Sequence, residues 1–137
     1  MALERSGPRH APSIAMALFC AFTVVFLASR DLFLPEVRDR EIWFGFELRG
    51  TAAVWTAPLH WALFSVACWA FWKNMRWIWP AATSYACYVA LSHLGWNLSS
   101  PSGGGWSAGL QQLGLFLVPA ILIWKLRPQS RSRPPAA

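Results

Sequence analysis

Charged residues are scarce in this chain, and over one long stretch they are missing altogether. Only 13% of the 137 residues are Asp, Glu, Lys or Arg, and none of these occurs between Trp77 and Trp124. One membrane crossing takes about 20 apolar residues, so this stretch is long enough for two crossings. The turn-forming residues 97–105, rich in Ser and Gly, divide it. The chain is therefore predicted to be an integral membrane protein with no soluble domain.

Several sequence motifs with known chemistry are absent as well. The cysteines Cys20, Cys68 and Cys87 lie inside apolar segments without metal-ligand spacing, so we interpret them as small hydrophobic residues. The sequence has no His-x-x-x-His pair and no Gly-x-Ser-x-Gly elbow. We therefore expect no metal and no other cofactor. The net charge of +6 comes from basic residues between and beyond the apolar runs, so it predicts membrane topology and no binding of nucleic acid.

The apolar runs predict an all-α fold, with four transmembrane helices in one small bundle. Their expected ranges are about 11–29, 50–72, 77–98 and 106–124. Residues 1–127 are expected to form this single domain, and residues 128–137 a disordered basic tail. A basic start before an apolar run also fits a cleaved signal peptide. No small-x-small cleavage site precedes Arg30, so we expect an uncleaved first helix.

The distribution of basic residues predicts the orientation of the four helices. Both ends of the chain and the short turn from Lys73 to Arg76 are basic, and in a four-helix chain these segments lie on one side of the membrane. By the positive-inside rule, both termini are expected in the cytoplasm. Many of the ten Trp residues lie near the expected helix ends, where Trp favours the membrane–water interface. We expect a multi-pass protein of the cell membrane, which in a bacterium is the inner membrane.

Residues 30–49 form the one strongly charged loop. Five of the six acidic residues of the chain lie here, among many apolar residues. This mixture is unlike a solvated linker and predicts a short amphipathic segment on the membrane surface.

Polar side chains inside the predicted helices lie mostly in the half away from the cytoplasm. Thr56 and His60 share one face of the second helix, and His93 and Asn97 share one face of the third. Burial of an unpaired polar group costs roughly 2–7 kcal/mol on transfer scales, so these groups should face one another or a wet cavity. The sequence predicts an outward-facing polar pocket that is roofed by the charged loop. Its candidate residues are Glu47, Arg49, Thr56, His60, His93, Asn97, Gln111 and Gln112.

Two classes of function fit such a pocket. The first is a non-catalytic subunit of a membrane assembly, or a binding partner for a lipophilic molecule, with membrane lipid around it. The ligand-binding candidates are then Arg49, Thr56, Asn97, Gln111 and Gln112. The second is an intramembrane enzyme with isomerase- or cyclase-like acid–base chemistry on an isoprenoid, sterol or lipid. In the enzyme, Glu47 or His60 would donate a proton and His93 would be the partner base.

Simpler interpretations stand beside these roles. Each histidine can hydrogen-bond a neighbouring helix, and a haem or chlorophyll-type pigment is a third possibility for either imidazole. Glu47 and Arg49 can form an interfacial ion pair that ends a helix. The three glycines at 103–105 can be a plain turn, a flexible gate or an anion-binding nest.

Overall fold

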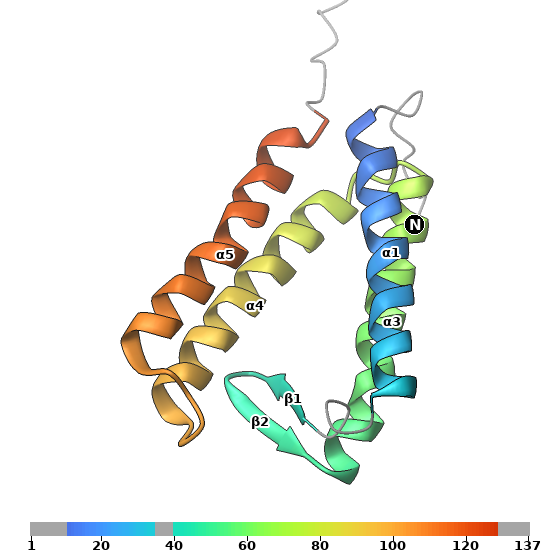
Figure 1. Cartoon of the computed structure of the whole chain (residues 1–137). Coiled ribbons are helices and arrows are strands. Elements are labelled where there is room, and N and C mark those ends of the chain that lie inside the picture. The colour runs from blue at the N-terminus through green and yellow to red at the C-terminus, as the bar shows by residue number, and fades with distance from the viewer. Residues whose placement is uncertain (1–10, 35–39, 129–137) are drawn as a thin grey trace, which may run out of the picture.

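The computed structural model describes residues 11–34 and 40–128 and consists of four long helices and one β-hairpin (Figure 1). The mostly helical fold with four helices is confirmed. The helices are α1 (Ala11–Phe33), α3 (Thr51–Trp72), α4 (Ile78–Ser99) and α5 (Gly105–Leu126), and strands β1 (Arg40–Trp43) and β2 (Phe46–Arg49) lie between α1 and α3. The tail expected to be disordered lies, from residue 129 onward, outside the described residues.

The helices form two antiparallel pairs, α1 with α3 and α4 with α5 (Figure 1). The pairs meet at the turn between α3 and α4 and diverge toward the other end, where the hairpin lies between them. The four helices that the sequence predicts are thus arranged as two pairs, because α3 and α4 touch over only a short length.

The apolar core lies at the end where the two pairs meet. Phe71 at the end of α3 and Trp79 at the start of α4 are each 1% exposed, and their rings meet edge to face with centroids 5.1 Å apart. Ala17 and Cys20 of α1 and Ile123 of α5 belong to the same buried cluster. Since all four helices contribute to it, apolar packing fixes the two pairs relative to each other at this end.

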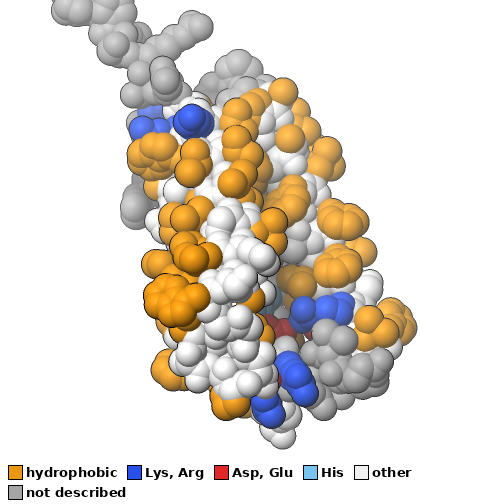
Figure 2. Space-filling view, turned by 60° about the vertical axis from the view of Figure 1, so that its left-hand side comes forward, with side chains coloured by type: hydrophobic (Ala, Val, Ile, Leu, Met, Phe, Trp, Pro, Cys, Tyr) orange, Lys and Arg blue, Asp and Glu red, His pale blue; other side chains and the backbone are white. Residues whose placement is uncertain are grey.

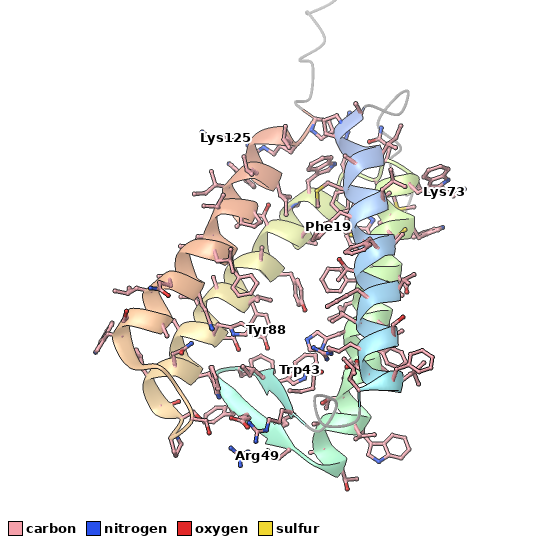
Figure 3. All side chains as sticks on the ribbon, viewed as in Figure 1. Phe19, Trp43, Arg49, Lys73, Tyr88 and Lys125 are labelled. Carbon is pink, nitrogen blue, oxygen red and sulfur yellow. The ribbon has the colours of Figure 1, made fainter. Side chains whose placement is uncertain are left out.

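The outer surface of the helices is apolar. α1, α3 and α5 are long and apolar enough to span a membrane. Phe22 on α1 and Leu115 on α5 are 68% and 66% exposed. Figure 2 shows apolar side chains over the middle of the molecule and basic ones near its two ends. Lys73 and Lys125 lie at the end with the α3–α4 turn, and Arg49 lies at the hairpin end (Figure 3). This surface indicates a multi-pass membrane protein.

A β-hairpin occupies residues 40–49, where the sequence led us to expect an amphipathic surface segment. β1 and β2 pair antiparallel, from Arg40 opposite Arg49 to Trp43 opposite Phe46. The two loop residues, Phe44 and Gly45, have φ angles of 51° and 80°. Positive φ at both central positions is the geometry of a type I′ turn, whose twist matches that of the strands. The flanking aromatic residues favour strands, and residues 30–33 continue α1 instead of joining the loop.

Candidate functional site

The predicted site residues do not share one pocket. The structure divides them between two polar clusters, the hairpin, and helix surfaces. The first cluster lies among α1, β1 and α3 and contains His60, and the second lies between α4 and α5 and contains His93. Because the two imidazoles have separate partners, they do not form the acid–base couple that the sequence suggested.

The first cluster is a network of buried charges. The guanidinium of Arg30 lies 2.6 Å from Asp31 Oδ1 and 2.7 Å from Glu41 Oε1. Asp31 Oδ2 accepts a hydrogen bond of 2.9 Å from Trp61 Nε1, and Glu41 Oε2 lies 3.2 Å from His60 Nδ1. The side chains of Asp31 and Glu41 are only 3% and 7% exposed. Two carboxylates at such depth require the arginine between them, since an unpaired buried charge is very costly.

His60 is oriented by this network. Its Nδ1 faces Glu41, and its ring stacks on Trp43 with centroids 4.4 Å apart. Within residues 11–34 and 40–128, no hydrogen-bond partner of Nε2 is found. A carboxylate that fixes one nitrogen of an imidazole and leaves the other free is the usual arrangement of a general base. The partners Arg30, Asp31 and Glu41 were missed from the sequence because they were assigned to a surface loop.

The pKa of Glu41 is lowered below its ordinary value of 4.5. Burial raises this pKa, but the hydrogen bond with His60 and the charges of His60 and Arg30 together outweigh it. A lowered folded-state pKa contributes stability that is fully present above the unfolded value and is lost as the pH falls through the folded value.

We therefore expect the protein to lose stability as the pH falls below 4.5. Unfolding midpoints of the detergent-solubilised protein, measured from neutral pH downward, check this. The variant Glu41→Gln should be less stable at neutral pH and should show a shallower decline in acid. A decline as steep as that of the parent protein would assign the acid sensitivity to other groups.

The second cluster joins α4 to α5. Asn97 is 3% exposed. Its Nδ2 donates to Gln112 Oε1 at 2.9 Å and to the carbonyl oxygen of His93 at 2.8 Å, while its Oδ1 accepts from the Gly104 N–H at 3.0 Å. Gln112 Oε1 also lies 3.0 Å from His93 Nδ1, which must carry a proton to donate to that oxygen. The polar groups of this cluster therefore supply one another's hydrogen-bond partners, as buried polar groups usually do.

The remaining candidates lie outside both clusters. Glu47 Oε2 accepts from Trp96 Nε1 at 3.0 Å and its Oε1 accepts from Arg49 Nε at 2.8 Å, and these two bonds lower the pKa of Glu47. Glu47 is thus ionised near neutral pH and is poorly suited to donate a proton. The Thr56 hydroxyl donates to the carbonyl oxygen of Ala52 in its own helix at 2.9 Å. Gln111 is exposed on the surface of α5.

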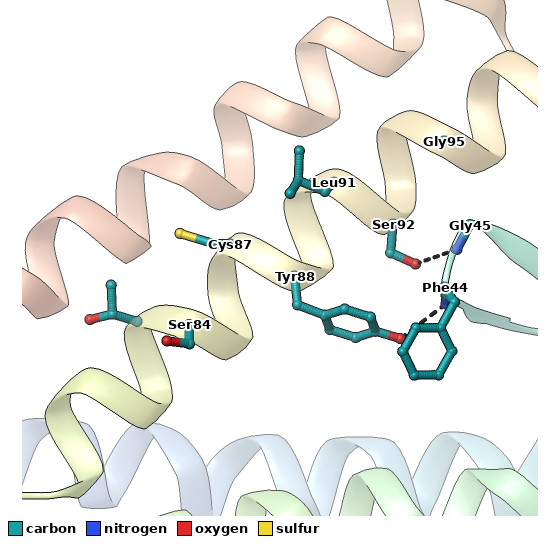
Figure 4. Close-up of a pocket in the computed structure, with 9 residues that line it drawn as sticks. Phe44, Gly45, Ser84, Cys87, Tyr88, Leu91, Ser92 and Gly95 are labelled. Carbon is teal, nitrogen blue, oxygen red and sulfur yellow. Dashed lines mark hydrogen bonds between the residues drawn. The ribbon is translucent and has the colours of Figure 1, made fainter.

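A groove of about 590 Å³ runs along α4 from the hairpin tip (Figure 4). Tyr88 and Ser92 hold the tip at its end, because Tyr88 Oη accepts from the Phe44 N–H at 3.0 Å and Ser92 Oγ accepts from the Gly45 N–H at 2.8 Å. Sequence reasoning missed the groove because its lining carries no charge. The lining residues are Phe44, Gly45, Thr83, Ser84, Cys87, Tyr88, Leu91, Ser92 and Gly95.

Comparisons with protein-family models, with curated proteins and with solved structures find no match to this chain. In the part of the chain that the structure describes, no group of three His, Cys, Asp or Glu side chains is placed to hold a metal ion.

Proposed function

We propose that this protein is a four-pass protein of the cell membrane that binds a lipophilic molecule in the groove along α4, without catalysis. The observation that carries the proposal is the groove itself. The groove is open along one side, and its volume of about 590 Å³ gives room for a small molecule. The role is that of a ligand-binding partner or small subunit of a membrane assembly.

The path of the chain supports a fourth crossing by α4. The end of α3 and the start of α5 lie at opposite ends of the molecule (Figure 1), and α4 connects them with 22 residues, none of them charged. If α3 and α5 span the bilayer, α4 must span it too. Lys73, Arg76, Lys125 and Arg127 then lie on one side, which supports cytoplasmic termini by the positive-inside rule.

The chemistry of the groove supports an uncharged occupant. Aliphatic and aromatic carbon from Leu91, Tyr88 and Phe44 lines it, and no charged residue among those that the structure describes does. Tyr88 and Ser92 already bond to the hairpin. The hydrogen bonds of the second cluster and of Glu47 likewise support a structural role for most of the predicted site residues. The occupant is thus recognised by its shape and apolar surface.

A bulky residue in the groove is expected to reduce ligand binding severalfold. Leu91 lines the groove and is 62% exposed, so tryptophan at this position takes up space that the ligand needs. The measurement is photolabelling of the protein in nanodiscs by a diazirine-bearing C16 alcohol, followed by mapping of the labelled peptides. We expect label on residues 83–95 of the parent protein and severalfold less in Leu91→Trp.

Leu18→Trp is the matched control, because Leu18 on α1 is also 62% exposed but does not line the groove. It should leave the labelling of α4 unchanged. Label spread evenly over all exposed helix faces, or equal loss in both variants, would contradict the proposal.

The first cluster favours a second candidate, the intramembrane enzyme with acid–base chemistry on an isoprenoid, sterol or lipid. Arg30 fixes Glu41, Glu41 fixes His60 Nδ1, and Nε2 is left to exchange a proton. His60 then has the role of the acid or base, without His93. Recovery of a chemically altered lipid from membranes with the parent protein, but not from those with a well-accumulated His60→Gln variant, would favour this candidate over simple binding.

A further inference from the structure

One face of α5 packs against α4 through a small residue, Gly109, and a carboxamide side chain, Gln112. A Cβ atom on Gly109 would lie 2.9 Å from Leu94 Cδ1 and 3.3 Å from Asn97 Cβ, so α5 packs closely against α4 at this glycine. Gln112 on the same side forms the hydrogen bonds of the second cluster. Close approach at a small residue, with an interhelical hydrogen bond beside it, is a usual way for helices to associate in a membrane.

A second face of α5 also carries a small residue and a carboxamide, and it is exposed in the described chain. Ser107, Gln111, Gly114 and Val118 follow one another at spacings of three and four residues, so they share a face, and all four are exposed. A Cβ atom on Gly114 would meet no atom within 4 Å. The packing of the described chain therefore does not require glycine at this position. In Figure 2, surface that is neither apolar nor charged runs between apolar side chains over the lower part of the α4–α5 pair.

The position of Gln111 makes this face costly if it lies against lipid. Gln111 is five residues beyond Trp106, or about 7.5 Å deeper along the helix axis at 1.5 Å per residue. Trp106 is 66% exposed near the end of α5, where tryptophan marks the interface. Lipid tails offer a carboxamide no hydrogen-bond partner, so a polar side chain at this depth favours contact with another helix.

We infer that the face formed by Ser107, Gln111, Gly114 and Val118 binds the same face of a second copy of this chain, related by a two-fold axis along the membrane normal. A carboxamide both donates and accepts hydrogen bonds. Two copies in the same orientation place their Gln111 side chains at equal depth, where each satisfies the other, and a two-fold interface is self-complementary in this way. Gly114 lets the two helices approach closely. The inference is independent of the proposed ligand, because none of the four residues lines the groove.

Disulfide trapping tests the interface directly. Val118→Cys and Val25→Cys are each made in a chain whose Cys20, Cys68 and Cys87 are replaced by alanine, and the proteins are oxidised in phosphatidylcholine vesicles. Val118 and the control Val25 on α1 are 57% and 65% exposed. We expect a disulfide-linked dimer of this chain from Val118→Cys and none from Val25→Cys. Equal trapping at both positions, or trapping at neither, would overturn the inference.

The adjacent glutamines separate association from folding. Gln111→Leu should raise the dimer dissociation constant about threefold to thirtyfold, since hydrogen bonds between membrane helices contribute about 0.6–2 kcal/mol. Its thermal midpoint as a monomer in excess detergent should not change. Gln112→Leu should lower that midpoint and leave the dissociation constant nearly unchanged. The parent chain remaining monomeric in vesicles, or an adduct of Val118→Cys with another membrane protein in place of the dimer, would show that a second copy does not bind there.

Discussion

Replacement of Arg30 by methionine is expected to lower the free energy of unfolding by about 3–5 kcal/mol, the usual cost of removing one partner from a buried ion pair. Arg30 is the one basic side chain that bonds both Asp31 and Glu41 in the described structure. Methionine has a similar length and keeps much of the packing, so the loss comes from the charge. Without the arginine, the two buried carboxylates repel each other, and only His60 and Trp61 remain as their hydrogen-bond donors.

Titration of the detergent-solubilised protein with dodecyl sulfate, followed by tryptophan fluorescence, measures this effect. Arg49→Met is the matched control, because the Arg49 side chain is 60% exposed, and its partner Glu47, which is 8% exposed, keeps the hydrogen bond from Trp96 and the nearby charge of Arg40. Exposed ion pairs contribute little to stability, so the control should unfold close to the parent protein. Similar unfolding of both variants would mean that water reaches the Arg30 network and screens its charges.

Replacement of Gly103 by alanine is expected to destabilise the fold by about 1–3 kcal/mol, the usual cost of overpacking. The new Cβ would lie 2.8 Å from both the Cα and the carbonyl carbon of Asn97. These are backbone atoms that no rotamer change can move. The loop must shift, and this disturbs the hydrogen bond from the Gly104 N–H to Asn97 Oδ1. The second cluster and the α4–α5 contact are then weakened together.

Gly114→Ala is the control for this prediction. Its Cβ meets nothing within 4 Å, and alanine is favoured over glycine in a helix by up to about 1 kcal/mol. The same titration, carried out in excess detergent so that the chain is monomeric, should place Gly114→Ala at or above the parent protein and Gly103→Ala below it. Equal stability of Gly103→Ala and the parent would support a loose, gate-like loop at 103–105.

The helices could be predicted because their signal is local. Runs without charge, ended by Arg30, Lys73 or the Ser- and Gly-rich turn at 97–105, locate each helix without knowledge of its neighbours, although α1 continues past Arg30 to Phe33. The spacing of His93 and Asn97 likewise predicts that they lie on one face, and in the structure Asn97 donates to the His93 carbonyl. Gln112 was included among the candidates because a polar side chain inside an apolar run needs a partner, and in the structure it bonds His93 and Asn97.

The pairing of polar groups could not be predicted, because it depends on which helices touch. His60 lies beside Glu41 only because the hairpin turns back over the first half of α3. That hairpin has Phe44 at a positive φ, a conformation that is uncommon for residues other than glycine, so its turn carries a weak sequence signal. The Thr56 hydroxyl donates its hydrogen bond within its own helix, so it needs no partner on a neighbouring helix. A single shared pocket was therefore the wrong inference from depth alone.

The network around Arg30 has a consequence for how the protein is made. All of its members lie between residues 30 and 61, so every partner is present once α3 has left the ribosome. Trp96, which bonds Glu47 of the hairpin, follows 35 residues after Trp61, or roughly 2–7 s later at 5–20 residues per second. The first helix pair can thus close during translation, and the nascent second pair inserts beside a partner that is already formed.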